Sequence, residues 1–277
     1  MKKIDRGKAF LVREADRFRC PVCHEGMHFR ENGLICTTGH RFDLSKKGTL
    51  YFLKRHLESE YTTTMLAHRR RMLQSGLYAP LVEHLAEIIA PEAALLDAGC
   101  GEGSFLAALE AAGHSGVKVG FDLSKEGIYL ATDLAADAFF CVADMTNLPF
   151  QTGSFAAILN ILSPSHYQEF KRVLAPDGRL IKVLPGSDYL AELRRGFFQD
   201  DRENYSNERV VQKLSAEMKI IEKTHLFYQQ QISNELFPDL LAMSPLTWQF
   251  SAQEKEQFLK NYSGEITIDL WIYQGVH

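Results

Sequence analysis

The stretch Leu-Leu-Asp-Ala-Gly-Cys-Gly-Glu-Gly, residues 95–103, decides the fold of this chain. An apolar run leads into Asp97, and glycines then follow at every second position, at Gly99, Gly101 and Gly103. Alternate glycines let the backbone turn tightly and approach a ligand without interference from Cβ atoms. Ligands of open parallel sheets bind beyond the carboxyl ends of the strands. The stretch therefore predicts a strand that ends in a ligand-binding turn.

The sequence around this turn alternates between strand-like and helix-like segments from residue 93 to about 190, which indicates βαβ units and a parallel sheet. The apolar runs are Leu95–Leu96, Val117–Phe121, Phe139–Val142, Phe155–Leu162 and Leu180–Leu184. Two more strands are predicted at Thr224–Ile232 and Ile266–Tyr273. The mostly apolar stretch between them, Leu236–Phe250, is predicted to form an insertion or lid near residues 234–255.

The spacing of the turn is G-x-G-x-G, whereas dinucleotide sites use a longer loop to place a pyrophosphate at a helix N-terminus. The shorter turn resembles the first motif of class I methyltransferases that use S-adenosylmethionine (AdoMet). Asp97 and Glu102 are then expected to position the cofactor. Asp122 ends the next strand, where a carboxylate can accept hydrogen bonds from ribose hydroxyls. Asp144 ends the third strand, where this class commonly contacts the adenine amino group.

A second motif lies nearer the N-terminus, where Cys20 and Cys23 are followed by Cys36 and His40. Two thiolates on a Cys-x-x-Cys turn, completed by a second pair of ligands, make a tetrahedral zinc site with no open position. The spacing therefore predicts a structural zinc. His24 and His28 are alternative ligands, although they break the paired geometry, and buried thiols without a metal are the other alternative.

The 277-residue chain has a net charge of −4, but its charges are unevenly distributed. Residues 1–80 carry 16 Lys and Arg against 8 Asp and Glu, and the remainder carries 15 against 27. The excess of positive charge in residues 1–80 predicts that this part of the chain contacts phosphates. The alternative is that these charges only form an ordinary solvated surface. Cations interleaved with the aromatic residues Phe42, Tyr51 and Phe52 suit RNA, and these are Arg41, Lys46, Lys47, Lys54 and Arg55. Arg69–Arg71, on a predicted helix further along, are expected to help dock the RNA.

We expect three parts: a zinc-binding, RNA-recognising module at residues 1–60, a helical linker at 61–92 that contributes to the AdoMet pocket, and a methyltransferase domain at 93–277. The first module has little room for a core of its own, so a metal would supply much of its stability. No apolar run approaches the roughly 20 residues of a membrane span, and the first residues lack the core of a signal peptide. We therefore expect a cytoplasmic protein.

Taken together, these motifs resemble the 23S rRNA (guanine-N1-)-methyltransferase family of the RlmA type. The resemblance rests on Cys-Pro-Val-Cys, Cys-Thr-Thr-Gly-His-Arg-Phe-Asp-Leu-Ser-Lys-Lys-Gly, Asp-Ala-Gly-Cys-Gly-Glu-Gly, Phe-Asp-Leu-Ser-Lys, Leu-Pro-Phe, Leu-Pro-Gly and Met-Ser-Pro-Leu-Thr-Trp. It implies an α/β fold with a Rossmann-like class I methyltransferase sheet and a small N-terminal zinc-binding module.

The resemblance also implies zinc at Cys20, Cys23, Cys36 and His40, and AdoMet contacts at Tyr78 and at Gly101–Gly103. Tyr189 stands where the family often has a histidine. The fourth strand runs into Asn160-Ile-Leu-Ser163-Pro164 instead of an arginine-led Ile-Tyr-Ala-Pro. We expect Asn160 and Ser163, with carbonyls beside Pro164, to hold the guanine edge.

The substrate implied is the helix 35 hairpin of 23S rRNA, at guanine 745 or 748, with overall similarity favouring 748. A homodimer is conceivable because one zinc module is small for grasping an RNA hairpin. Two alternatives stay open: methylation of a small molecule such as a quinone or phenol, and a non-catalytic RNA-binding protein that uses AdoMet only structurally.

Overall fold

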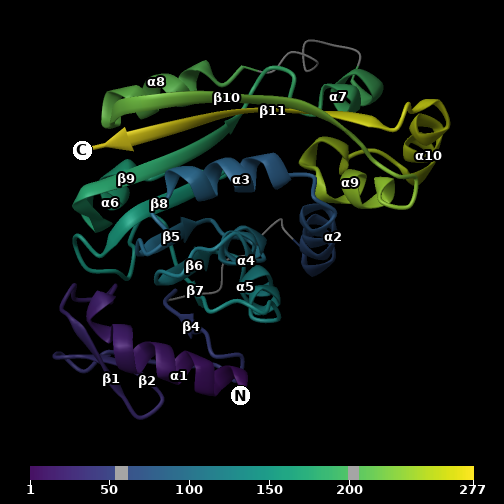
Figure 1. Cartoon of the computed structure of the whole chain (residues 1–277). Helices are drawn as coiled ribbons and strands as arrows, with labels where there is room; N and C mark the ends of the chain where they lie inside the picture. The colour runs from purple at the N-terminus through teal and green to yellow at the C-terminus, as the bar shows by residue number, and fades with distance from the viewer. Residues whose placement is uncertain (54–61, 199–205) are drawn as a thin grey trace.

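The computed structural model describes residues 1–53, 62–198 and 206–277. Its centre is an eight-stranded sheet in which six parallel strands are followed by two antiparallel ones (Figure 1). In spatial order the strands are β10 (Lys219–Gln231), β11 (Glu265–Val276), β9 (Leu174–Pro185), β8 (Phe155–Ile161), β5 (Leu95–Ala98), β6 (Lys118–Asp122), β7 (Phe139–Val142) and β4 (Leu50–Tyr51). The predicted Rossmann-like α/β sheet is confirmed.

The strand order reverses at β5, because β6 and β7 follow on one side of it and β8 and β9 on the other. Such a switch point opens a crevice at the carboxyl ends of the strands. The glycine turn that follows β5 and the Asn160–Pro164 segment at the end of β8 therefore lie at the same edge of the sheet.

Two of the helices around the sheet begin at residues suited to a helix N-terminus. Thr62 caps α2 (Thr63–Gln74), its hydroxyl accepting a hydrogen bond from the Met65 amide at 3.2 Å. Pro80 lies in the first turn of α3 (Ala79–Ile88), where its missing N–H costs nothing. The other helices of the described sheet domain are α4 (Ser104–Ala111), α5 (Lys125–Ala131), α6 (Tyr167–Val173), α7 (Ala191–Phe197), α8 (Glu208–Glu217), α9 (Phe237–Met243) and α10 (Ala252–Asn261).

The N-terminal module consists of α1 (Lys3–Glu14), η1 (Ala15–Arg17) and an antiparallel sheet of β1 (Met27–Arg30), β2 (Gly33–Cys36) and β3 (Arg41–Asp43). It lies beyond β7, at the opposite end of the molecule from β10 (Figure 1). Its last strand, β4, joins the large sheet by pairing with β7. Residues that we assigned to a separate module thus extend the central sheet.

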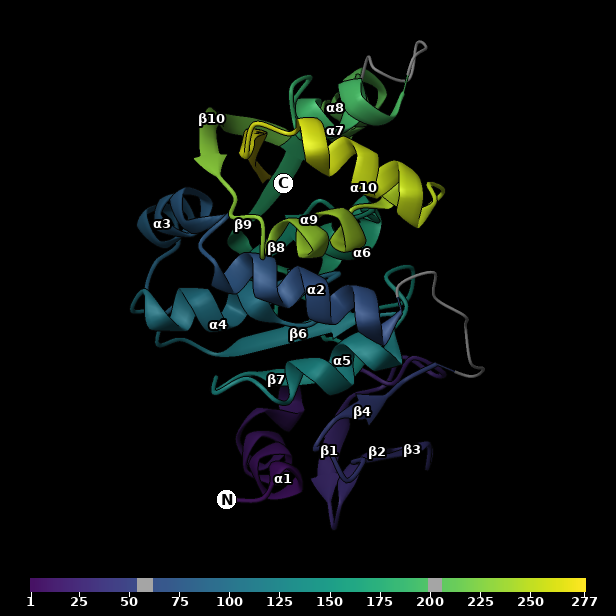
Figure 2. The ribbon, with the colours of Figure 1, turned by 90° about the vertical axis from the view of Figure 1, so that its right-hand side faces the viewer.

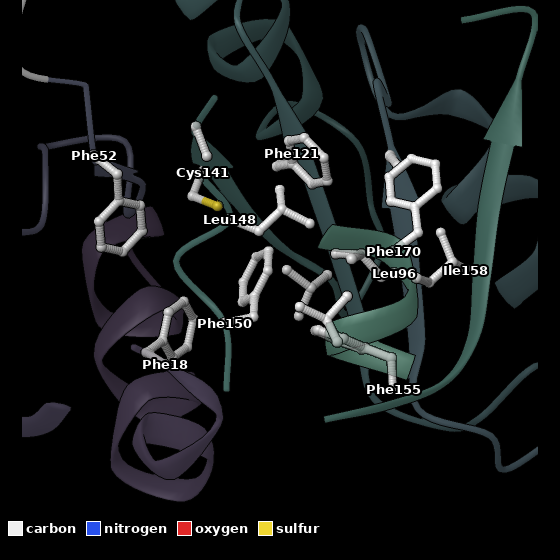
Figure 3. Packing of buried hydrophobic residues seen from close by; sticks show 14 of the residues in the cluster. Phe18, Phe52, Leu96, Phe121, Cys141, Leu148, Phe150, Phe155, Ile158 and Phe170 are labelled. Atoms are coloured by element: carbon white, nitrogen blue, oxygen red, sulfur yellow. The ribbon is translucent and has the colours of Figure 1, made fainter. Parts of the chain in front are cut away.

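The module also shares a hydrophobic core with the sheet, which the sequence did not predict. Phe18 is fully buried, with its ring centroid 5.5 Å from that of Phe150 and 5.8 Å from that of Phe139. Phe52 packs on the other side of Phe18, with centroids 6.1 Å apart (Figure 3). Apolar burial of this kind stabilises the module in addition to any metal.

The segment between β10 and β11 contains α9, η3 (Pro245–Thr247) and α10, where an insertion is predicted. Figure 2 shows α9 beside α2, and Asp239 joins the two helices by accepting hydrogen bonds from Arg71 Nε at 2.9 and 3.0 Å. His68 Nδ1 lies 2.5 Å from the same carboxylate. Among the described residues, no helix is long and apolar enough to cross a membrane.

Candidate active site and metal centre

The glycine turn is built from backbone conformations that side chains rarely adopt. Gly99 and Gly101 have φ angles of 80° and 56°. A Cβ atom on Gly99 would overlap the hydroxyl of Ser163, and one on Gly101 would lie 2.8 Å from Arg69 Nη1. The turn is therefore packed against the end of β8 on one side and against α2 on the other.

Two carboxylates of the turn are buried without their full complement of hydrogen bonds. Asp97 and Glu102 are 2% and 1% exposed, and Asp97 Oδ2 and Glu102 Oε2 have no hydrogen-bond partner among the described residues. Burial raises the pKa of Asp97 to about 7, with Arg69 opposing the shift. Unsatisfied buried acceptors are costly, so this pair fits a ligand that brings its own donors, such as an ammonium group.

Asp122 lies at the end of β6, next to the turn. Its carboxylate accepts hydrogen bonds from the Gly101 amide at 2.9 Å and the Ser124 amide at 2.8 Å. Burial nevertheless raises the pKa of Asp122. The amides hold the carboxylate over the turn, and its remaining lone pairs suit the ribose hydroxyls expected from the sequence.

Asp144 follows β7, one strand further along the sheet. Its Oδ1 accepts hydrogen bonds from the amide and the hydroxyl of Thr146, both at 2.8 Å. The ends of β5, β6 and β7 thus each present a carboxylate at one edge of the sheet, as the sequence predicts for a cofactor that spans them.

The sequence did not predict that Arg69 lies against the glycine turn. Its side chain is 22% exposed, with Nε 3.8 Å from Glu102 Oε2. Arg70 Nη2 donates to the carbonyl of Glu102 at 3.1 Å, and Arg71 pairs with Asp239. All three arginines thus contact other parts of the protein, although the Arg71 side chain is still 48% exposed and Arg69 also lines a cavity, so their docking of RNA stays a prediction.

A cavity of about 740 Å³ opens between the end of β8, α2, α8 and the segment after α9. Five cationic side chains line it, and no Asp or Glu does so among the described residues. These cations are Arg69, Lys182, Arg194, Arg209 and Lys213. Arg209 and Lys213 lie one helical turn apart on α8, and both are exposed. A cavity with this lining attracts anions although residues 81–277 are acidic overall.

Tyr78 and Tyr189 meet in the wall of this cavity, as expected if both serve one ligand. Their hydroxyl oxygens lie 2.5 Å apart, although the residues are 111 positions apart in the sequence. Burial raises the pKa of both phenols, so both stay protonated at neutral pH. Tyr189 thus lies beside Tyr78 in the wall of the cavity.

Asn160 and Ser163 differ in their access to the cavity. Ser163 lines it, whereas Asn160 is fully buried. Asn160 Nδ2 lies 2.9 Å from the Ala98 carbonyl and 2.8 Å from the Pro164 carbonyl, and Oδ1 accepts from Ser165 and Lys182 at 2.8 and 2.5 Å. The expectation that Asn160 holds the substrate is therefore corrected, because its amide joins β5 to the turn after β8 instead.

The predicted zinc ligands converge within the N-terminal module. Their ligand atoms all lie within 4.8 Å of one another, with Cys23 Sγ 3.6 Å from Cys36 Sγ and Cys36 Sγ 3.4 Å from His40 Nδ1. A tetrahedral zinc ion with bonds of about 2.3 Å to sulfur separates two sulfur ligands by roughly 3.8 Å. Burial opposes ionisation of Cys36, but hydrogen bonds from Thr38 and the His40 amide outweigh it and lower its pKa to about 6.

The other expectations for the module are partly corrected. His24 and His28 are exposed and lie outside the ligand cluster. Phe52 is buried and packs against Phe42, with ring centroids 5.0 Å apart, so it belongs to the core and does not present a face to RNA bases. Arg41 pairs with Glu31 and Asp43. Lys54 and Arg55 lie outside the described residues.

Comparison with known proteins supports both the glycine-turn site of the sheet and the metal site of the N-terminal module. Residues 96–182 match a family model described as a methyltransferase domain, and residues 18–53 match the zinc-ribbon model described as the N-terminal part of RlmA. A Bacillus subtilis protein, YxjB, assigned to the 23S rRNA (guanine-N(1)-)-methyltransferases, is 38% identical over 94% of this chain and 96% of its own length. The chain belongs to the 23S rRNA (guanine-N1)-methyltransferase family.

A more distant relative in this family is the 23S rRNA (guanine(748)-N(1))-methyltransferase of Streptomyces fradiae, 28% identical over 91% of this chain and 94% of its own length. The two matched regions coincide with the two sites, since one begins at β5 and the other encloses all four metal ligands. The chain is thus an AdoMet-dependent methyltransferase with a structural zinc.

Sequence reasoning missed three features of the site: Arg69 over the glycine turn, Lys182 beside Asn160, and the α8 cations. Lys182 had a signal, because it interrupts the otherwise apolar run Leu180–Leu184 and is only 2% exposed. For Arg69, the three consecutive arginines of α2 project about 100° apart around the helix, so they cannot share one surface.

Proposed function

We propose that this protein methylates N1 of a guanine in the hairpin loop of helix 35 of 23S rRNA, at position 748. The relatives support this substrate, because the relative from Streptomyces fradiae is named as a methyltransferase of guanine 748. Position 745 is the alternative within the family. The guanine N1 atom lies on the base-pairing edge, so the base has to be unpaired before it enters the cavity.

One observation carries the choice of RNA over a quinone or phenol. The cavity beside the glycine turn is lined by five cations and, among the described residues, by no carboxylate. Cations gathered around a cavity that no carboxylate lines attract a ligand that carries negative charge. A nucleotide in an RNA loop brings a phosphate on each side of the base, whereas a neutral aromatic substrate brings none.

AdoMet, when bound, supplies an electrophilic methyl group. The chain's own contribution is to hold and orient the two reactants. Asp97 and Glu102 offer buried acceptors to the amino-acid part of the cofactor, and Asp122 and Asp144 offer carboxylates to its nucleoside part. Tyr78 and Tyr189, in the wall of the cavity, are proposed to contact the cofactor as well.

The guanine is proposed to lie against Ser163 and Pro164, which line the cavity at the end of β8. Asn160 acts as a positioning residue, because its amide fixes Ser163, at 2.8 Å, and the Pro164 carbonyl, also at 2.8 Å. The base-binding role that we expected for Asn160 is thus assigned to the segment that it holds.

The zinc-bearing part of residues 1–60 is proposed to dock the rest of the hairpin, as the basic charge of residues 1–80 suggests. A homodimer would let two such modules grasp one RNA. We place the reaction in the cytoplasm, where a ribosomal RNA substrate is made.

The test is transfer of a tritiated methyl group from AdoMet. We expect label in unmodified 23S rRNA and none in small-molecule extracts. Label in a small molecule, with 23S rRNA unlabelled, would replace this proposal by the quinone or phenol alternative. Absence of any turnover in the presence of both would favour a non-catalytic RNA-binding protein.

A further inference from the structure

Lys182 is buried without an ionic partner. It lies on β9, where it pairs with Asn160 on β8 and with Tyr273 on β11, and it is only 2% exposed. No Asp or Glu forms an ion pair with it among the described residues, although buried lysines are usually paired. In Lys118, the other buried lysine of the described sheet, the ammonium group lies 3.1 Å from Glu110. A lone buried cation calls for an explanation other than stability.

The hydrogen bonds of Lys182 within the protein use only two of the three donors of its ammonium group. An ammonium group has three donors and no acceptor. Two are directed at protein oxygens, Asn160 Oδ1 at 2.5 Å and the Ser163 carbonyl. Lys182 also lines the cavity, next to Ser163 and Pro164. One donor therefore remains for a ligand at the place proposed for the guanine.

The chemistry of guanine identifies the atom that this donor can meet. The base-pairing edge of guanine carries N1–H and N2–H donors and one acceptor, O6. A lysine has only donors, so on this edge it can bind O6 alone. O6 is also where negative charge gathers when N1 loses its proton.

We propose that Lys182 donates a hydrogen bond to O6 of the target guanine and thereby stabilises the charge left when N1 gives up its proton. The inference rests on the proposed function and adds a residue to it. N1 releases its proton to water, the electron pair of the former N–H bond forms the bond from N1 to the methyl carbon, and the electrons of the broken methyl–sulfur bond remain on sulfur. Lys182 keeps its own protons throughout. Its part is that of an oxyanion-hole donor.

This role makes the methylation rate depend on pH, because Lys182 donates best in its protonated form. Burial lowers the pKa of Lys182 to about 8, so the ammonium form dominates at neutral pH and is lost above pH 8. The other titratable groups that face the cavity are Tyr78, Tyr167 and Tyr189, whose pKa values burial raises, together with Arg69, Arg194, Arg209 and Lys213. Tyr273 pairs with Lys182 from β11, and burial raises its pKa too.

The experiment measures single-turnover methylation of the rRNA fragment between pH 6 and 10 for the full-length protein and for Lys182→Met. We expect the wild-type rate to level off or fall above about pH 8. In Lys182→Met we expect a rate roughly 10²-fold lower at pH 7, the cost of one oxyanion donor, and a continuous rise with pH as N1 ionises unaided. AdoMet affinity should stay within about twofold of wild type.

Lys118→Met is the matched control, because Lys118 is 3% exposed but lies at the start of β6, at the opposite edge of the sheet. It should lower the melting temperature without changing the shape of the pH profile. A Lys182→Met profile that keeps the wild-type shape and rate would overturn the inference. A wild-type protein that methylates no RNA would instead refute the proposed function.

A second measurement does not depend on how well the variant folds. An rRNA fragment with 6-thioguanine at the target replaces O6 by sulfur, a weaker acceptor. For the wild-type protein, this substitution should remove the plateau or fall above pH 8. Retention of the wild-type profile on the thio substrate would contradict contact between Lys182 and O6.

Discussion

Replacing Arg209 and Lys213 by glutamine removes two of the five cations of the cavity without touching the glycine turn. Each cation that neutralises a phosphate of single-stranded RNA contributes about 0.7 to the slope of log affinity against log salt. The double variant should therefore flatten this slope by about 1.4. Between 50 and 200 mM salt, that change amounts to a roughly sevenfold smaller loss of affinity.

The assay is filter binding of the helix 35 hairpin over this range of salt, with AdoMet affinity measured in parallel. Lys255→Gln with Lys260→Gln is the matched control, because it removes the same charge from α10, away from the cavity. The control should leave the slope unchanged. The reasoning is refuted if both double variants shift the slope equally, or if Arg209→Gln with Lys213→Gln weakens AdoMet and leaves the slope as it was.

Three further predictions concern the cofactor, the core and the metal. Since burial raises the pKa of Asp97 to about 7, AdoMet binding by calorimetry should tighten about tenfold from pH 6 to pH 8 as the carboxylate ionises, and Asp97→Asn should bind weakly at every pH. Phe18→Ala should cost about 3–5 kcal/mol and lower the melting temperature by roughly 6–20 °C, because this fully buried ring joins the module to the sheet; an unchanged melt would contradict a shared core. Cys36→Ser should reduce bound zinc, measured by mass spectrometry, from one ion per chain toward none, while AdoMet still binds; full zinc occupancy would exclude Cys36 as a ligand.

Much of this architecture could be predicted because its signals are local. The run Leu95–Leu96, the three alternate glycines and the Asp122 carboxylate each depend on a few neighbouring residues, and the parallel order of the strands follows from their alternation with helices. The zinc ligands are equally local, since Cys20 and Cys23 share one turn and Cys36 and His40 share another.

What could not be predicted depends on side-chain direction and on distant packing. Asn160 looks from the sequence like a substrate contact, but its amide points into the protein, where three carbonyl and hydroxyl oxygens lie within hydrogen-bond distance. The docking of Phe18 onto Phe150 joins residues 132 positions apart in the sequence. Such contacts have no local pattern.

The most direct test of the central claim is primer extension on 23S rRNA after incubation with the protein and AdoMet. Methylation at N1 blocks base pairing, so the account predicts a new reverse-transcription stop in the helix 35 loop, next to guanine 748. A stop next to guanine 745 would correct the position only. Incorporation of methyl groups into rRNA without a stop in this loop would contradict the account, because the methylated atom would then not lie on the pairing edge of a helix 35 guanine.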